Sequence, residues 1–235
     1  MKKIIYKFPS RGRPNKFKDV LDKSIAFQSK KHHVRYVITM DTDDATMNNQ
    51  EMRDYFKNLK DSYDVDIVYH YGDSKSKIEA CNANLENESG DAVILVSDDM
   101  VPVSQDWDDI IVEVMDHHGY DIGVKFWDGL RPKQDPLMTL PVMGWKLYEA
   151  IGHLYHPSYT SLYSDNEMTQ VCSMLGKFVR VDYCIFQHQW TPEPFDELHA
   201  RNENQEMYKI DGAIFEQRQK DKFDIESIVR KLELA

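Results

Sequence analysis

A short apolar run that ends in two adjacent carboxylates is the strongest constraint on the fold of this chain. Residues 92–96, Ala-Val-Ile-Leu-Val, lead directly into Ser97, Asp98 and Asp99. A continuous apolar run of this length is typical of a buried strand, and the acids then lie at the rim of the sheet. Because neighbouring strand residues point to opposite faces, Asp98 and Asp99 are expected to differ in role, one on a hydrated cation and one on a ligand hydroxyl. The alternative is a strand end followed by a solvated turn.

The N-terminal half of the sequence alternates between strand-like and helix-like segments. Strands are predicted at residues 4–8, 34–40, 65–71 and 92–96, and apolar side chains recur at helical spacing after each of them. Gly90 is expected to end the third helix and Ser104 to cap the fourth. This order favours an α/β fold with a mainly parallel central sheet flanked by helices, with ligands at the carboxyl ends of the strands.

The C-terminal half does not show the same alternation of strands and helices. Its main predicted elements are, in order, a strand at 121–127, a long connection at 128–140, and a strand at 178–187. Before that last strand, Ser164 and Glu167 fit a capping box, which starts a helix that ends at Gly176.

The whole chain is expected to form a single domain. Residues 1–220 make up its body, within which residues 191–220 have narrow apolar stripes and are predicted to form a lid or packing arm. Residues 221–235 are predicted to be an amphipathic helix that packs on the domain.

Composition excludes several classes of protein. The chain has 235 residues, of which 41% are hydrophobic, so a sizeable core is expected. A net charge of −11 without a long basic cluster gives no strong signal for nucleic-acid binding. The three cysteines lack Cys-x-x-Cys spacing, which argues against a disulfide framework or a zinc knuckle. No apolar run is long enough for a signal-peptide core or a membrane span, so we expect a cytoplasmic protein without membrane insertion.

Polar residues follow three of the predicted strands. Residues 9–14, Pro-Ser-Arg-Gly-Arg-Pro, lie between a strand and a helix, an arrangement that suits an anion, although an ordinary connection with solvated arginines is equally compatible. Asp41 follows the second strand and is expected to contact a ribose or a base edge, or to cap the next helix. Lys77 and Asn82 lie near the start of the third helix, where the lysine either meets a phosphate or is solvated.

The order of these features resembles that of the GT-A glycosyltransferases, especially the inverting family-two type, from Ile4 to about His188. The resemblance implies a nucleotide-sugar-binding half at residues 1–100 and an acceptor half at residues 101–190. Ser97-Asp98-Asp99 is similar to the Asp-x-Asp element of that family, with serine in place of the first acid. The resemblance implies that Asp99 is a direct metal ligand, and that Asp98 and Ser97 contact the sugar donor.

Three residues downstream reproduce a second part of the family pattern. Asp165, Gly176 and His188 follow the order of a catalytic base, a helix-ending glycine and a metal-ligating histidine. The resemblance implies that Asp165 is the general base and that His188 is a metal ligand. Glu167 is a rival for the base, because the residue before Asp165 is serine where the family has an acid.

The remaining candidates for donor binding lie in loops and at helix starts. They are Pro9, Ser10 and Arg11 in the first loop, Asp41 after the second strand, Lys77 and Asn82 near the third helix, and Gly144 in a small-residue segment.

The function that the resemblance implies is metal-dependent transfer of a sugar. The donor is a nucleoside diphosphate sugar, with UDP as the expected nucleotide, the acceptor is a hydroxyl, and the cofactor is Mn²⁺ or Mg²⁺. Transfer is expected to invert the anomeric centre, with a retaining mechanism left open. The alternatives are a metal-dependent nucleotidyl- or phosphotransferase, and a non-catalytic nucleotide-sugar-binding protein on the same fold.

Overall fold

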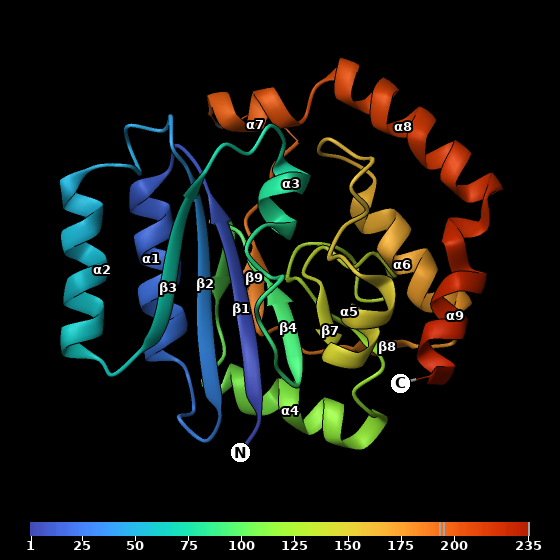
Figure 1. Cartoon of the computed structure of the whole chain (residues 1–235), viewed down its shortest axis with the longest axis horizontal. Coiled ribbons are helices and arrows are strands. Elements are labelled where there is room, and N and C mark those ends of the chain that lie inside the picture. The colour runs from blue at the N-terminus through green and yellow to red at the C-terminus, as the bar shows by residue number, and fades with distance from the viewer. Residues whose placement is uncertain (193, 195, 235) are drawn as a thin grey trace.

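A seven-stranded mixed sheet forms the centre of the computed structural model, which describes residues 1–192, 194 and 196–234 (Figure 1). In spatial order its strands are β3 (Asp66–Gly72), β2 (His33–Asp41), β1 (Lys3–Ser10), β4 (Ala92–Leu95), β7 (Val142–Gly144), β6 (Gly123–Phe126) and β8 (Phe178–Val181). Strands β3, β2, β1 and β4 run parallel, whereas β7 is antiparallel to both of its neighbours. The predicted α/β fold with a mainly parallel sheet is therefore confirmed.

Helices cover both faces of the sheet. One face packs against α1 (Pro14–Ala26), α2 (Gln50–Ser62) and α4 (Trp107–His118), and the other against α3 (Lys77–Asn82), α5 (Trp145–Ile151), α6 (Ser164–Met174) and α9 (Ile225–Leu234). Alternate residues of β1 divide between the two cores, so that Tyr6 joins the first and Ile5 the second. Strands buried on both faces need apolar side chains at nearly every position, which is the pattern of residues 92–96.

The helices form where the apolar spacing predicts them. In α1, Pro14 occupies the first turn, and Phe17, Val20 and Leu21 are buried on one face. In α2, the side chain of Asn49 accepts a hydrogen bond from the backbone N–H of Met52 and so caps the helix.

The C-terminal arm consists of α7 (Glu197–Asn202) and α8 (Gln205–Lys220), followed by a 3₁₀ turn (Lys222–Asp224) and α9. Figure 1 shows α7 and α8 passing along the edge of the molecule before α9 returns to pack beside α5. Residues 193 and 195 of the predicted arm and residue 235 of the predicted last helix lie outside the described residues. Within the described residues, no helix is long and apolar enough to cross a membrane.

Two predicted helix boundaries are wrong. Helix α3 ends at Asn82, so Gly90 does not close it; a Cβ on Gly90 would lie 3.0 Å from the carbonyl oxygen of Lys3, and this close backbone approach explains the glycine. Ser104 does not cap α4, because its hydroxyl donates to the carbonyl of Cys184 at 2.7 Å. The helix starts instead after Asp106, whose backbone is left-handed.

The strand predicted at 178–187 is also divided in two. Its first part is β8, and its second part, β9 (Phe186–His188), leaves the central sheet and pairs antiparallel with β5 (Met100–Pro102). In this small sheet Met100 is the partner of His188. The pairing brings a histidine from the second half of the chain beside the acids that follow β4.

Candidate active site

A cleft of about 560 Å³ opens at the carboxyl ends of β1, β2 and β4. Ten of the predicted site residues line it, namely Pro9, Ser10, Arg11, Asp41, Lys77, Ser97, Asp98, Asp99, Asp165 and His188. Parallel strands that share one direction place their terminal loops at one edge, which is why residues far apart in the sequence meet here.

Asp99 and His188 face each other in the cleft. Nε2 of His188 lies 3.6 Å from Oδ2 of Asp99, and the Ser97 hydroxyl donates to the other carboxylate oxygen. Burial favours the protonated acid, but the imidazole of His188 and the Ser97 hydroxyl keep the pKa of Asp99 below its usual value. Asp99 is therefore an ionised carboxylate beside an imidazole nitrogen, the ligand types that Mn²⁺ accepts.

The fit of these residues to a divalent ion depends on how many donors they supply. Among residues 1–192, 194 and 196–234, no group of three or more His, Cys, Asp or Glu side chains forms a metal cluster. Asp99 and His188 would supply two ligands, and a hard cation held by them would take the rest of its coordination from oxygen atoms of a substrate and water. Nδ1 of His188 is buried without a partner among the described residues. The donor set fits an ion that is shared with an oxygen-rich substrate.

Asp98 lines the cleft, but both of its carboxylate oxygens accept hydrogen bonds from the protein. Its Oδ2 accepts from the Ser10 hydroxyl at 3.2 Å, and its Oδ1 accepts from Nη1 of Arg13 at 2.7 Å. The same guanidinium donates through Nε and Nη2 to Asp196, the N-cap of α7, at 2.6 and 2.7 Å. Burial raises the pKa of Asp98, and the charge of Arg13 opposes that rise. The two adjacent acids therefore differ in environment, but they lie in a turn after β4 and not on opposite faces of a strand, and Asp98 anchors an arginine.

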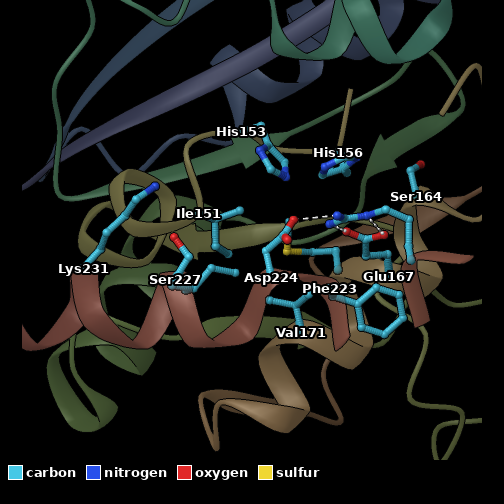
Figure 2. A pocket seen from close by; sticks show the side chains of 13 residues that line it. Ile151, His153, His156, Ser164, Glu167, Val171, Phe223, Asp224, Ser227 and Lys231 are labelled. Carbon is cyan, nitrogen blue, oxygen red and sulfur yellow. Dashed lines mark hydrogen bonds and ion pairs between the residues drawn. The ribbon is translucent and has the colours of Figure 1, made fainter. Parts of the chain in front are cut away.

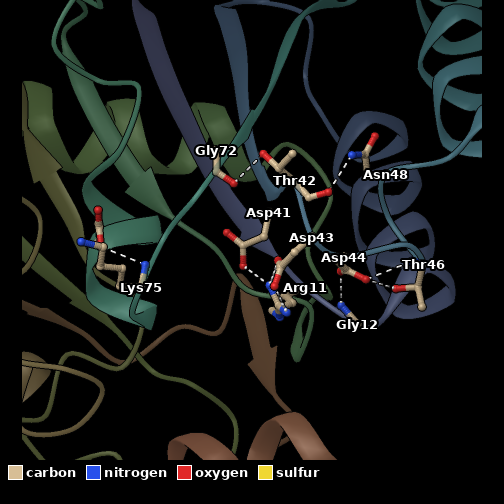
Figure 3. A network of polar contacts seen from close by, with 11 residues as sticks. Arg11, Gly12, Asp41, Thr42, Asp43, Asp44, Thr46, Asn48, Gly72 and Lys75 are labelled. Carbon is tan, nitrogen blue, oxygen red and sulfur yellow. Dashed lines mark hydrogen bonds and ion pairs between the residues drawn. The ribbon is translucent and has the colours of Figure 1, made fainter.

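A second polar network surrounds Asp41 at the end of β2 (Figure 3). Nη1 of Arg11 donates to Oδ2 of Asp41 at 2.8 Å, and the guanidinium also binds Asp43. Asp44 accepts from the backbone N–H of Gly12 at 2.7 Å, which fixes the loop after β1. Oδ1 of Asp41 is buried and has no hydrogen-bond partner in the described part of the chain. Asp41 therefore offers a free acceptor atom at the wall of the cleft.

Asp165 lies in the first turn of α6. This helix begins after Tyr163, whose backbone is left-handed. One carboxylate oxygen accepts from the backbone N–H of Asn166 at 2.9 Å. Burial raises the pKa of Asp165, while the positive charges of Lys77 and Arg131 oppose the rise. Lys77 also acts electrostatically on Asp99, so a single lysine faces both acids. A carboxylate with a raised pKa in a cleft is suited to proton transfer.

Glu167 does not line this cleft. Its carboxylate accepts from Nε and Nη2 of Arg218 at 3.1 and 2.6 Å and from the Tyr159 hydroxyl at 2.8 Å. It lies instead at a separate cavity of about 220 Å³ bordered by α5, α6 and α9 (Figure 2). The predicted capping box is wrong, because Glu167 reaches the arm and the side chain of Ser164 makes no cap hydrogen bond.

Two further predicted donor-binding residues also lie outside the cleft. The side chain of Asn82 donates to the carbonyl of Tyr155 and accepts from the backbone N–H groups of Leu154 and Tyr155, so it fixes a turn. Gly144 is packed so closely that a Cβ would lie 2.1 Å from the carbonyl oxygen of Tyr120. Both residues have structural reasons for their identity.

The arm supplies contacts that sequence reasoning missed. Asp211 of α8 is fully buried and accepts from three successive backbone N–H groups, those of Thr160, Ser161 and Leu162, at 2.7 to 2.9 Å. These three residues line the cleft. In the sequence, Asp211 has helical spacing to Tyr208 and Phe215. An acid on such an apolar stripe could have indicated that Asp211 is buried and paired. Arg13 and Arg131, also missed, carry no periodic signal.

The fold is similar to that of solved glycosyltransferases. Mannosyltransferase PcManGT from Pyrobaculum calidifontis, solved with GDP-Man and Mn²⁺, matches with a TM-score of 0.63 and 13% identity over 100% of this chain and 75% of its own. S. aureus TarS 1–349 in complex with UDP-GlcNAc matches with a TM-score of 0.61 and 13% identity over 89% of this chain and 64% of its own. Mycobacterium tuberculosis glucosyl-3-phosphoglycerate synthase with Mg²⁺ and UDP matches with a TM-score of 0.53 and 17% identity over 84% of this chain and 74% of its own. In two further comparisons the chain spans only 60% of TarS 1–349 and 37% of the TarS chain.

Comparisons at the level of sequence give no such likeness, since neither a family model nor a curated protein matches the chain. The strand order and the similarity to these structures show that the chain has the GT-A fold. At 11 to 17% identity the likeness extends to the fold and not to a particular donor or acceptor.

Proposed function

We propose that the protein is a metal-dependent glycosyltransferase that moves a sugar from a nucleoside diphosphate sugar to an acceptor hydroxyl with inversion. The observation that carries this proposal is the pairing of Asp99 with His188 in the same cleft as Asp165. The likeness to solved structures that contain UDP-GlcNAc, GDP-Man, Mn²⁺ and Mg²⁺ supports the same class of donor and ion.

Each residue has a chemical role in this scheme. Asp99 and His188 would hold Mn²⁺ or Mg²⁺, which supplies positive charge for the diphosphate leaving group. Lys77 adds a second positive charge beside Asp99, where it would bind a donor phosphate. Asp165 removes the proton from the acceptor hydroxyl as the new glycosidic bond forms and the bond to the diphosphate breaks.

The nucleotide is proposed to bind along the wall formed by the loop after β1 and by Asp41. The unpartnered Oδ1 of Asp41 suits an N–H group of the base or a ribose hydroxyl. Arg11 holds the other oxygen of Asp41 and so fixes the orientation of the carboxylate. UDP is the first donor nucleotide to test, because the imide N–H of uracil is a single donor for that oxygen.

Thermal unfolding in the presence of nucleotides tests the proposal. UDP, GDP and their sugars are added with and without Mn²⁺; a ligand at a hundred times its Kd stabilises by about 2.7 kcal/mol. We expect a shift that requires Mn²⁺ and that His188→Gln removes. His156→Gln is the matched control, since His156 lines the separate cavity.

Product analysis then separates glycosyl transfer from the other classes of function. Glycosyl transfer or slow donor hydrolysis releases an intact nucleoside diphosphate, whereas a nucleotidyltransferase releases a cleaved one. Donor binding without either reaction would indicate a binding protein, and no metal-dependent shift with any donor would contradict the proposal.

A further inference from the structure

Arg131 presents an incompletely paired guanidinium to the cleft. It lies in the connection between β6 and β7 and lines the same cavity as Asp165. Its Nε is buried and has no hydrogen-bond partner among residues 1–192, 194 and 196–234. The nearest carboxylates are longer ion pairs, with Asp128 at 3.9 Å from Nε and Asp135 at 3.6 Å from Nη1. The side chain as a whole is 34% exposed and lines the cleft, so a ligand there can approach the guanidinium.

The two carboxylates near Arg131 are already used to shape the loop. Asp128 accepts from the backbone N–H groups of Leu130 and Arg131 at 3.0 and 2.9 Å and from the Thr139 hydroxyl at 3.1 Å. Asp135 accepts from the backbone N–H of Leu137 at 2.9 Å. The loop therefore keeps its turns without a hydrogen bond from the guanidinium, and a purely structural role leaves Nε unexplained.

The backbone that carries Arg131 is held firmly. The indole N–H of Trp127 donates to the carbonyl of Arg131 at 2.7 Å. The buried ammonium group of Lys125 donates to the carbonyl of Asp135 in the same loop. A cation on a fixed backbone is preorganised, so it binds an anion without first having to order the loop.

The charge of Arg131 acts on two groups that line the cleft, Asp165 and Tyr208. It opposes the rise in the pKa of Asp165, and it also lowers the pKa of Tyr208 on α8, which burial raises overall. The other two arginines beside the strand ends, Arg11 and Arg13, are each bound to two carboxylates. Arg131 differs from them because it acts on Asp165 and its guanidinium makes no hydrogen bond with either of its neighbouring carboxylates.

We propose that the acceptor carries an anionic group, a phosphate or a carboxylate, and that Arg131 binds this group while the acceptor hydroxyl lies at Asp165. The inference rests on the proposed function, and it adds a substrate class and a residue that determines specificity. A planar guanidinium donates two parallel hydrogen bonds to either anion, which fixes orientation as well as position.

Calorimetric titration of the enzyme saturated with UDP and Mn²⁺ tests the inference. The probes are glycerol 3-phosphate, glycerate and glycerol, which differ in the anionic group. We expect at least one of the two anions to bind, glycerol to give no measurable binding, and Arg131→Gln to weaken anion binding at least tenfold. The anion that binds more tightly identifies the acceptor group as phosphate or carboxylate.

Lys133→Gln is the matched control for this experiment. Lys133 is exposed in the same loop and lies over the ring of Trp127 at 4.7 Å, outside the cleft, so its loss removes an equal charge without removing the site. The inference is wrong if neither anion binds the UDP-saturated enzyme, or if Arg131→Gln binds them as tightly as Lys133→Gln does. Failure of UDP itself to bind would reject the proposed function, which is a separate and earlier result.

Discussion

Arg13 and Asp98 form an ion pair at 2.7 Å in which the carboxylate is almost completely buried. Because Arg13 also holds Asp196, the acid Asp98 after β4 is connected through one guanidinium to the N-cap residue of α7 in the arm. We predict that Arg13→Gln speeds amide hydrogen exchange in α7 while exchange in β1 and β2 stays slow. Arg11→Gln, which removes a neighbouring arginine that contacts Asp41 and Asp43, should leave exchange in α7 unchanged.

Asp165 and Glu167 can be separated as candidate bases by paired amide substitutions. Asp165→Asn is expected to lower the transfer rate by about 10²- to 10⁴-fold, the usual contribution of a general base, with UDP affinity retained. Glu167→Gln is expected to keep most of the rate and to lower the free energy of unfolding by about 1 to 3 kcal/mol, because it weakens the buried contacts with Arg218 and Tyr159. Full activity of Asp165→Asn would rule out the assignment.

The pH dependence of kcat/KM follows from the raised pKa of Asp165. A general base must be ionised, so activity should fall as pH drops through a value above the ordinary aspartate pKa of about 3.9. Asp99, whose pKa is lowered, stays ionised over that range. Lys77→Gln removes a charge that opposes the shift, and the acid limb should then move to higher pH. An acid limb that stays in place in this variant would show that another group titrates.

Asp211 should contribute strongly to stability. Asp211→Ala leaves three backbone N–H groups of the cleft wall without their acceptor, and we expect the free energy of unfolding in urea to fall by about 3 to 5 kcal/mol. Glu216→Ala, an exposed position on the same helix, is the control and should change it by less than about 0.5 kcal/mol. Equal effects of the two substitutions would contradict this role.

Lys7 is fully buried in β1, where burial lowers the pKa of its ammonium group from 10.5 to about 7. Between these values the unfolded chain binds more protons than the folded one, so this group makes stability rise with pH, and below pH 7 its full penalty is present. Lys7→Met should therefore stabilise the protein by about 1 to 4 kcal/mol at pH 6, with a smaller gain at pH 9. Thermal unfolding at both pH values measures this, with the exposed Lys57→Met as control.

Local pattern was sufficient to predict the four parallel strands β1 to β4 and the acids that follow β4, whereas no strand was predicted at β7. The apolar run before Ser97 has the composition that a strand buried on both faces requires, and the acids after it lie at the cleft as expected. Asp165 and His188, which the resemblance singled out, both line this cleft. What these residues do there remains a proposal.

The errors arise where long-range contacts override local signals. Glu167 fits a capping box with Ser164, but Arg218, 51 residues away, provides a stronger partner for its carboxylate. Asp98 looks free in the sequence because Arg13 becomes its neighbour only when β1 and β4 pair. The approach of His188 to Asp99 depends on a separate two-stranded sheet, which the spacing of apolar residues does not reveal.

The contact between Asp211 and the segment from Thr160 to Leu162 also bears on how the chain is synthesised. The βαβ units of the first half are local in sequence and can form while the ribosome is still adding residues. The three amide groups of the cleft wall receive their acceptor only after α8 has emerged. A nascent or truncated chain that stops before Asp211 can therefore acquire much of the central sheet but not the finished wall of the cleft, and completion of synthesis becomes a condition for a complete site.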